Sequence, residues 1–255
     1  MRMQLATAAS AILAVGCAPA FAGSELVAQE RDFLLSTPRA SISLRAGVSV
    51  PRAEGGGSRP SLWDFAREQL TVETNDLTGA YLLGEIGVRA SEHVDFVLAV
   101  GYTSSAVRSE YRHWVDTDDL PIEQTTEFTT TPVTVGVRYY PLPRGRQVGS
   151  YAWIPNAVGP FVGIAGGGVR YRFEQDGDFV DDETLDIYSD NLRSVEASPT
   201  LHLFAGLDAS VNTRMLLTTE VRYGFASAPL DDSFKGFADL DLAGLHLSCG
   251  LTFRL

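Results

Sequence analysis

The sequence predicts an all-β fold: an eight-stranded antiparallel up-and-down transmembrane β-barrel. Three observations predict it. Eight stretches alternate apolar with polar or small residues, which is the pattern of strands that have two different faces. Each stretch is about 10–14 residues long, enough for a tilted strand to cross a bilayer. Short and long connections alternate between the stretches, as in membrane barrels. The stretches are residues 40–50, 79–90, 95–105, 129–142, 159–173, 198–211, 215–227 and 245–255.

The amino-terminal residues have the three parts of a secretory signal peptide. Arg2 supplies an early positive charge, an apolar run follows, and residues 20–22 form a small-x-small cleavage site. Cleavage before Cys17, as in a lipoprotein, is the alternative. No later apolar run is long enough to form a membrane-spanning helix. The chain is therefore divided into a signal peptide (1–22), a periplasmic amino-terminal segment (23–39) and the barrel (40–255).

One face of each stretch carries no charge, whereas the other mixes small residues with charged ones. In the first stretch, Ile42 and Leu44 alternate with Ser43 and Arg45. In the fifth stretch the alternation gives an apolar face of Phe161, Ala165, Val169, Tyr171 and Phe173, opposed by Gly166, Gly168, Arg170 and Arg172. The uncharged faces are expected to meet lipid.

The charged faces are expected to line the lumen. Buried charges need partners, so we predict an interior ion-pair network of Arg45, Glu85, Glu220 and Arg222. A soluble barrel of the lipocalin kind, with an apolar interior, is the alternative. Eight strands enclose a space that side chains can fill, so we expect no wide, water-filled channel. Seven arginines are available to fill it: Arg45, Arg89, Arg138, Arg170, Arg172, Arg222 and Arg254.

Aromatic residues near the ends of the stretches predict two belts at the two membrane interfaces. The periplasmic belt would contain Tyr139, Tyr140, Phe161 and Phe253. The opposite belt would contain Tyr102, Tyr171, Phe173 and Phe225.

The connections predict which end of the barrel faces outward. The long ones, residues 51–78, 106–128, 174–197 and 228–239, are expected to be extracellular loops. An even number of strands then places both chain ends in the periplasm, and residues 143–158 form an unusually long periplasmic turn.

Two long connections contain features of their own. Residues 61–70, "SLWDFAREQL", roughly follow a helical period, and Ser61 could cap the helix. This helix would pack on neighbouring loops or form an exposed partner-binding patch. Residues 174–191 are acidic and could supply oxygen ligands to Ca²⁺, although the spacing does not match an EF-hand loop. A solvated acidic loop is the simpler interpretation, so we predict no metal site and no cofactor.

Composition excludes some classes of function. The net charge is −12 and Lys235 is the only lysine, which argues against a nucleic-acid partner. Cys249 would be the only thiol after signal cleavage, so it cannot form an intramolecular disulfide. His246 and Ser248 share the lumen face, but no third group is evident to orient the histidine, and we predict no enzymatic activity.

Three motifs resemble the family of small outer-membrane barrels, the OmpA- and OmpX-like transmembrane domains, over about residues 40–255. They are "GPFVGIAGGGVRYRF", "LLTTEVRYGF" and the terminal "SCGLTFRL". The last resembles the family's barrel-assembly signal through Ser248, Gly250 and Phe253, but it ends on Leu255 where the family usually has Phe. "SLRAGVSVPR" resembles the opening strand of OmpW-like barrels, which carry small hydrophobic compounds.

The resemblance implies a cell outer-membrane location and a structural or surface-interaction role. The expected partners are outer-membrane lipids, lipopolysaccharide, the barrel-assembly machinery and an extracellular partner reached through the loops. OmpW-like transport of small hydrophobic molecules is the alternative, and it predicts a lateral opening or an apolar lumen near the loops. A lipid-modifying barrel enzyme is a third possibility.

Overall fold

A computed structural model of the chain describes residues 33–255, apart from 54–59, 117, 150, 182–183 and 185. The predicted signal peptide lies outside the described residues. The elements are β1 (Ala40–Pro51), α1 (Leu62–Gln69), η1 (Thr74–Leu77), β2 (Gly79–Arg89), β3 (Val94–Val115), β4 (Pro121–Tyr139), β5 (Gly145–Val148), β6 (Ala152–Pro155), β7 (Val158–Val180), β8 (Ile187–Ser210), β9 (Met215–Phe225), β10 (Ser227–Ala228), η2 (Asp232–Phe234), β11 (Leu240–Asp241) and β12 (Gly244–Arg254).

Eight of these strands close into one antiparallel barrel, so the predicted fold is confirmed. Each barrel strand pairs with the next one along the chain, in the order β1-β2-β3-β4-β7-β8-β9-β12. The ring closes where β1 pairs with β12, from Ser41 opposite Arg254 to Pro51 opposite Gly244. Among the described residues, no helix has the length and apolarity needed to cross a bilayer.

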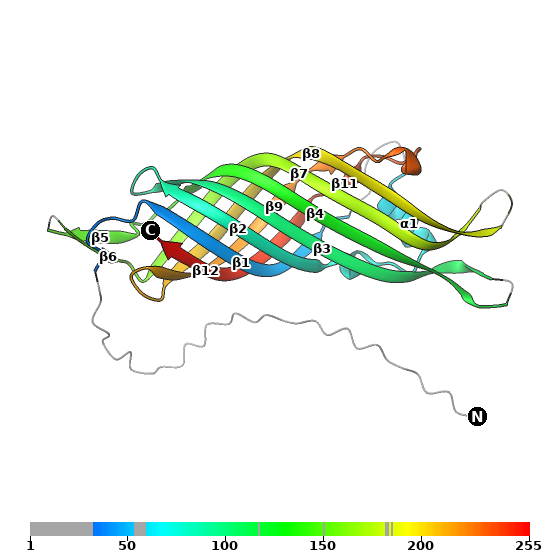
Figure 1. Cartoon of the computed structure of the whole chain (residues 1–255), viewed down its shortest axis with the longest axis horizontal. Helices are drawn as coiled ribbons and strands as arrows, with labels where there is room; N and C mark the ends of the chain where they lie inside the picture. The colour runs from blue at the N-terminus through cyan, green and yellow to red at the C-terminus, as the bar shows by residue number, and fades with distance from the viewer. Residues whose placement is uncertain (1–32, 54–59, 117, 150, 182–183, 185) are drawn as a thin grey trace, which may run out of the picture.

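The two ends of the barrel differ, and we name them by what they carry (Figure 1). The terminus end holds the start of β1, the end of β12 and the β5–β6 hairpin, which forms the long turn of residues 143–158. The loop end holds α1 and the longer hairpins. This arrangement follows from the even strand number, which returns the chain to the end where it started.

The outer surface carries an apolar belt. Outward-facing Leu44, Ile86, Leu98, Val135 and Leu203 are each between 45% and 69% exposed, although they are large apolar residues. Soluble monomers rarely expose a continuous surface of this kind, whereas a barrel that crosses a membrane presents it to lipid. The inward-facing Arg45, Glu85 and Arg222 are buried, which is the opposite of a lipocalin-like interior.

The predicted face of β7 was wrong, however. Phe161, Ala165, Val169, Tyr171 and Phe173 point inward and are buried, whereas Arg170 and Arg172 face outward and are exposed. Val162 and Ile164, which are 50% and 49% exposed, supply the outward apolar face instead.

Glycines on the neighbouring strand explain why aromatic rings fit inside. Phe161 lies opposite Gly206, and Gly163 lies opposite Phe204, on β7 and β8. A Cβ on Gly206 would lie 2.4 Å from the Phe161 ring, and one on Gly163 would lie 2.2 Å from the Phe204 ring. Each ring therefore occupies the space left by the opposing glycine, which is a recognised way to place aromatics in curved sheets.

Two other expectations are also corrected. Half of the residues predicted for the aromatic belts are buried in the lumen, namely Tyr140, Phe161, Tyr171 and Phe173. The other half are exposed as expected, namely Tyr102, Tyr139, Phe225 and Phe253. Most of the predicted loops 106–128 and 174–197 are strand, because β3, β4, β7 and β8 are 22, 19, 23 and 24 residues long. Cross-strand pairing continues there beyond the apolar belt.

Candidate functional site

The middle of the lumen holds a layer of buried ion pairs. Arg45 on β1 donates to Glu220 at 2.6 Å and to Glu85 at 2.7 Å. The Nε of Arg222 donates to Glu220 at 2.8 Å. The structure thus brings together all four residues that were expected to form a network, and they come from β1, β2 and β9. Each side chain is at most 2% exposed.

Arg138 on β4 is a fifth member of this layer. Its guanidinium donates to Glu85 and lies 3.6 Å from Glu220. The alternation of residues 129–142 places Arg138 on the charged face but does not identify its partner, because the register between β2, β3 and β4 decides which charges share a level.

Three arginines therefore surround two glutamates, and aromatic rings accommodate the surplus charge. The Arg138 guanidinium lies 4.3 Å from the Phe161 ring centroid, and that of Arg222 lies 4.5 Å from the Phe204 centroid. Cation–π contacts of this kind are strongest where water is excluded. Because the Phe161 ring on the inner face of β7 contacts the Arg138 guanidinium, the orientation of β7 contributes to the stability of the ion layer.

Between the ion layer and the loop end, the lumen is filled by stacked rings. His246 stacks on Tyr81 with centroids 4.6 Å apart, and His202 lies 6.3 Å from His246. Ser248 is also buried on this face. His202 is hydrogen-bonded to the Thr200 hydroxyl at 3.0 Å. These contacts give both histidines a packing role.

An apolar plug closes the loop end of the lumen. It consists of Trp63 of α1, Phe234 of η2 and Leu240 of β11, packed on Phe128 and Phe173 of the barrel wall. The Trp63 ring meets both wall rings edge-on at 5.5 Å. Its indole N–H donates to the Asp241 carbonyl at 3.3 Å.

The predicted helix is part of this plug. Residues 62–69 are helical as predicted, and Leu62, Trp63 and Ala66 are buried. Ser61 occupies the N-cap position but makes no side-chain cap bond. The helix thus packs into the barrel mouth and on neighbouring loops. Among its large apolar residues, Phe65 alone is exposed.

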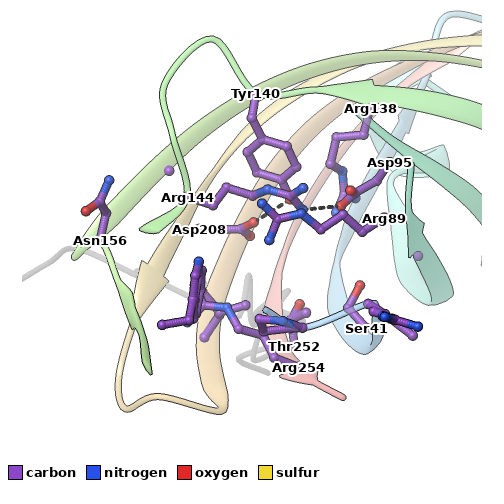
Figure 2. A pocket seen from close by; sticks show the side chains of 17 residues that line it. Ser41, Arg89, Asp95, Arg138, Tyr140, Arg144, Asn156, Asp208, Thr252 and Arg254 are labelled. Carbon is purple, nitrogen blue, oxygen red and sulfur yellow. Dashed lines mark hydrogen bonds and ion pairs between the residues drawn. The ribbon is translucent and has the colours of Figure 1, made fainter. Parts of the chain in front are cut away.

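The terminus end of the lumen is polar. Tyr140, which follows β4, donates its hydroxyl to Asp208 at 2.8 Å, and Thr218 donates to the same carboxylate at 2.6 Å. Arg144 donates to Asp95 at 2.6 Å and lies over the Tyr140 ring. A small cavity opens among these residues (Figure 2).

At the loop end, four strands continue past the apolar belt as a protruding sheet. We define it as residues 105–115 of β3, 121–130 of β4, 171–180 of β7 and 187–199 of β8. Figure 1 shows its two hairpins projecting beyond the other strands. Their outward faces carry charges such as Arg108, Glu127 and Arg172, which places this part outside lipid.

One edge of the protruding sheet is covered. Thr71 donates its backbone N–H to the Glu110 carbonyl at 2.8 Å, and its hydroxyl accepts from the Glu110 N–H at 2.9 Å. Leu70 forms a bridge with Tyr111, and Arg112 donates to the Leu70 carbonyl at 2.7 Å. The loop before β2 thus pairs with β3 over this stretch.

The other edge of the protruding sheet is open. One side of β8 pairs with β7 from Ile187 onward. The other side pairs with β9 only from Leu201 onward. Within the part of the chain that the structure describes, no strand pairs with the outer edge of β8 between 187 and 193. From Ser194 onward the segment around η2 lies against β8, where the Asp231 N–H donates to the Ser194 hydroxyl at 3.0 Å.

The acidic residues expected to form a loop lie on the β7–β8 hairpin. Asn191 bridges Glu174 at 3.0 Å and Asp176 at 3.2 Å, and Ser189 donates to Asp178. Asp182 and Glu183 lie outside the described residues. Over the described ranges, no group of three or more His, Cys, Asp or Glu is placed to hold a metal ion.

The residues of the expected assembly signal lie on and just after β12. Ser248 faces the lumen, whereas Phe253 faces outward and is 47% exposed. Gly250 is needed for close strand approach, since a Cβ there would lie 2.1 Å from the Leu44 carbonyl oxygen. Leu255 accepts a hydrogen bond from Arg39 and donates one to Ala40, which ties the last residue to β1.

Comparisons with known proteins found likeness among solved structures. OprG, an outer membrane protein from Pseudomonas aeruginosa, is 14% identical, with 87% of this chain and 99% of that chain covered and a TM-score of 0.47. Neisserial surface protein A is 11% identical, with 85% and 96% covered and a TM-score of 0.45. Ail, the attachment invasion locus protein of Yersinia pestis, is 12% identical, with 86% and 100% covered and a TM-score of 0.43.

No family model and no curated protein matches the sequence. The assignment of the chain therefore rests on its own geometry. A closed eight-stranded antiparallel ring, an apolar outer belt and a charged, filled lumen together are the architecture of a small outer-membrane β-barrel.

Proposed function

We propose that the protein is an outer-membrane surface-interaction barrel that binds an extended, basic polypeptide segment of another protein along β8. The observation that carries this proposal is the open outer edge of β8 at residues 187–193 on the protruding sheet. An unpaired strand edge presents a row of backbone donors and acceptors that another strand can complete.

Orientation supports the proposal. At the terminus end the connections after β2 and β8 are short and the one after β4 carries the β5–β6 hairpin, whereas the long hairpins lie at the opposite end. In outer-membrane barrels, the short turns face the periplasm and the long loops face outward. The protruding sheet would then face the cell exterior, while outer-membrane lipids and lipopolysaccharide surround the belt and the assembly machinery recognises β12.

Charge specifies the partner's chemistry. The segment from Glu174 to Glu196 contains nine acidic residues and one basic residue, Arg193. A strand added beside this hairpin would meet a negative field, which favours lysine or arginine on the incoming segment and makes association depend on salt.

The test uses a synthetic peptide with alternating lysine and valine as the probe. Its binding to the folded protein in nanodiscs is followed by fluorescence polarisation. Successive residues of a strand point their N–H groups to opposite sides, so Asp190→Pro and Asn191→Pro form a matched pair. In one of these two variants, proline removes an N–H that points away from β7, toward the open edge. This variant should keep the hairpin and lose binding of the peptide.

The other proline variant removes an N–H that pairs with β7 and should disturb the hairpin, which circular dichroism would detect. Equal binding by the wild type and by a variant with an intact hairpin and a blocked edge would refute the proposal. A dimer that disappears in the same variant would instead identify a second copy of the chain as the occupant.

Transport of small hydrophobic molecules is the second candidate, because the lumen near the loops is apolar. The apolar plug fills that space, with Trp63 and Phe234 buried in it. Transport would therefore require the plug to move, and the ion layer below it would still block the path. We expect no conductance steps from the purified protein in a planar bilayer, and large steps would contradict a closed lumen.

A further inference from the structure

The cavity at the terminus end of the lumen has a volume of about 40 Å³ and is lined by residues of all eight barrel strands. This space exceeds that of a single water, since one probe-sized water needs about 10–15 Å³ on this measure. Residues before β1 and from the β5–β6 turn also border it. Figure 2 shows Arg89, Asp95 and Arg144 on one side of the cavity, with Thr252 and Arg254 on the other.

Positive charge predominates around the cavity. Five arginines line it (Arg39, Arg89, Arg138, Arg144 and Arg254), against two carboxylates (Asp95 and Asp208). Arg138 is paired with Glu85, and Arg144 is paired with Asp95. Asp208 accepts from the hydroxyls of Tyr140 and Thr218.

Arg89 and Arg254 remain without a carboxylate partner among the described residues, although both border the cavity. Arg89 donates its Nε to the Ser91 carbonyl at 3.2 Å. Arg254 donates to the Thr213 carbonyl at 3.3 Å and to the Ser210 hydroxyl at 3.1 Å. Neither guanidinium forms an ion pair with a carboxylate, although Asp95 and Asp208 lie near enough to act on them electrostatically. With five arginines against two carboxylates, a partly enclosed site of this kind attracts an anion.

The geometry of the side chains matches a tetrahedral oxyanion. Guanidinium groups present several N–H donors in a plane, which suits phosphate and carboxylate oxygens. Aromatic rings hold two of the guanidinium groups in place, since Arg144 lies 4.4 Å from the Tyr140 centroid and Arg254 lies 5.3 Å from that of Trp153. Such support lowers the entropy lost when an anion binds.

Asp95 narrows the choice of anion. One of its carboxylate oxygens, Oδ2, accepts from Arg144, but Oδ1 is buried and has no hydrogen-bond partner among the described residues. A buried acceptor needs a donor. Phosphate carries a proton near neutral pH and could donate it to Oδ1, whereas sulfate carries none and would only be repelled.

We propose that this cavity binds a phosphate group, with Arg89 and Arg254 as its principal ligands and Asp95 as the acceptor that selects phosphate over sulfate. The phosphate could be free inorganic phosphate or the headgroup of a phospholipid. Since all eight strands enclose the cavity, its opening faces along the barrel axis.

The test is isothermal titration calorimetry of the folded protein in dodecyl maltoside, a detergent without phosphate, at pH 7 and constant ionic strength. Sodium phosphate should bind saturably, and Arg89→Gln and Arg254→Gln should each weaken binding by about tenfold. Arg170→Gln is the matched control, because Arg170 faces outward on β7 and should leave binding unchanged. A heat-dependent shift in gel mobility checks that each variant is folded.

Selectivity and source are tested in the same experiment. Sulfate should bind more weakly than phosphate to the wild type, and Asp95→Asn should reduce this preference. Competition between dihexanoyl phosphatidylglycerol and inorganic phosphate would show that a lipid headgroup also reaches the site, whereas absence of competition would assign it to the free ion. Binding that is absent, or that is unchanged in both arginine variants, would overturn the proposal.

Discussion

The barrel strands fall into two groups that end at different levels. The short group, β1, β2, β9 and β12, has 11 or 12 residues per strand, and it supplies four of the five charges of the central ion layer. The long group, β3, β4, β7 and β8, continues past the apolar belt into the protruding sheet. Charges in the central ion layer are held by buried carboxylates and aromatic rings, whereas charges on the protruding sheet are solvated and can differ freely.

The largest effect is expected from removing a carboxylate in the ion layer. Glu85→Ala would leave Arg45, Arg138 and Arg222 around Glu220 alone, and an unpaired buried charge typically costs about 3–5 kcal/mol. Urea unfolding of the protein refolded in lipid vesicles measures this loss of stability.

The matched variant in the protruding sheet is Glu123→Ala, which removes the exposed ion pair with Arg108. Exposed pairs of this kind contribute below about 1 kcal/mol. Similar losses for the two variants would contradict the distinction between the ring and the sheet.

An intermediate effect is expected from the apolar plug. Trp63→Ala would remove the ring that contacts Phe128 and Phe173, but the plug can open without unfolding the ring of strands. We expect the free energy of local opening of residues 60–78 and 228–243 to fall by about 3 kcal/mol, the low end for truncating a buried tryptophan. Limited proteolysis should cut these segments faster, while the heat-dependent gel shift is retained. Loss of the gel shift would mean that the plug and the wall fold as one unit.

The smallest effect concerns the protruding hairpin. A hydrogen bond from Asn191 and the charge of Arg172 hold the pKa of Glu174 below its ordinary value. The contribution of this carboxylate is therefore present above its unfolded-state pKa and is lost as pH falls through the folded value. Asn191→Ala should raise the pKa of Glu174, as measured by NMR titration, without changing unfolding of the ring. An unchanged pKa would assign the effect to Arg172.

The strand faces are predictable from the sequence wherever a charged residue lies on the lumen side. Arg45, Glu85 and Glu220 identified the inner faces of β1, β2 and β9, because such residues cannot face lipid. In β7, Arg172 lies on the protruding sheet and Arg170 directly precedes it, and both face outward, so the same rule predicted the wrong inner face for this strand. The rings of Phe161 and Phe204 fit inside only because Gly206 and Gly163 lie opposite, and that depends on the pairing between strands.

The candidate sites were predictable to a similar extent. Four members of the ion layer could be identified from residue type and alternation, whereas Arg138 required the register of three strands. The open edge of β8 had no sequence signal, since it arises from the difference in length between β8 and β9. Arg89 and Arg254 were expected to fill the lumen, but their lack of carboxylate partners depends on where the strands end.

The pairing of β1 with β12 has a consequence for how the protein folds. The two strands that complete the ring stand at opposite ends of the barrel sequence, so the final contact closes the longest loop in the molecule and carries the largest loop-closure entropy. Every other barrel pair joins neighbours along the chain and can form earlier. Folding should therefore proceed through an open, curved sheet whose two free edges remain vulnerable to aggregation until the last strand is in place.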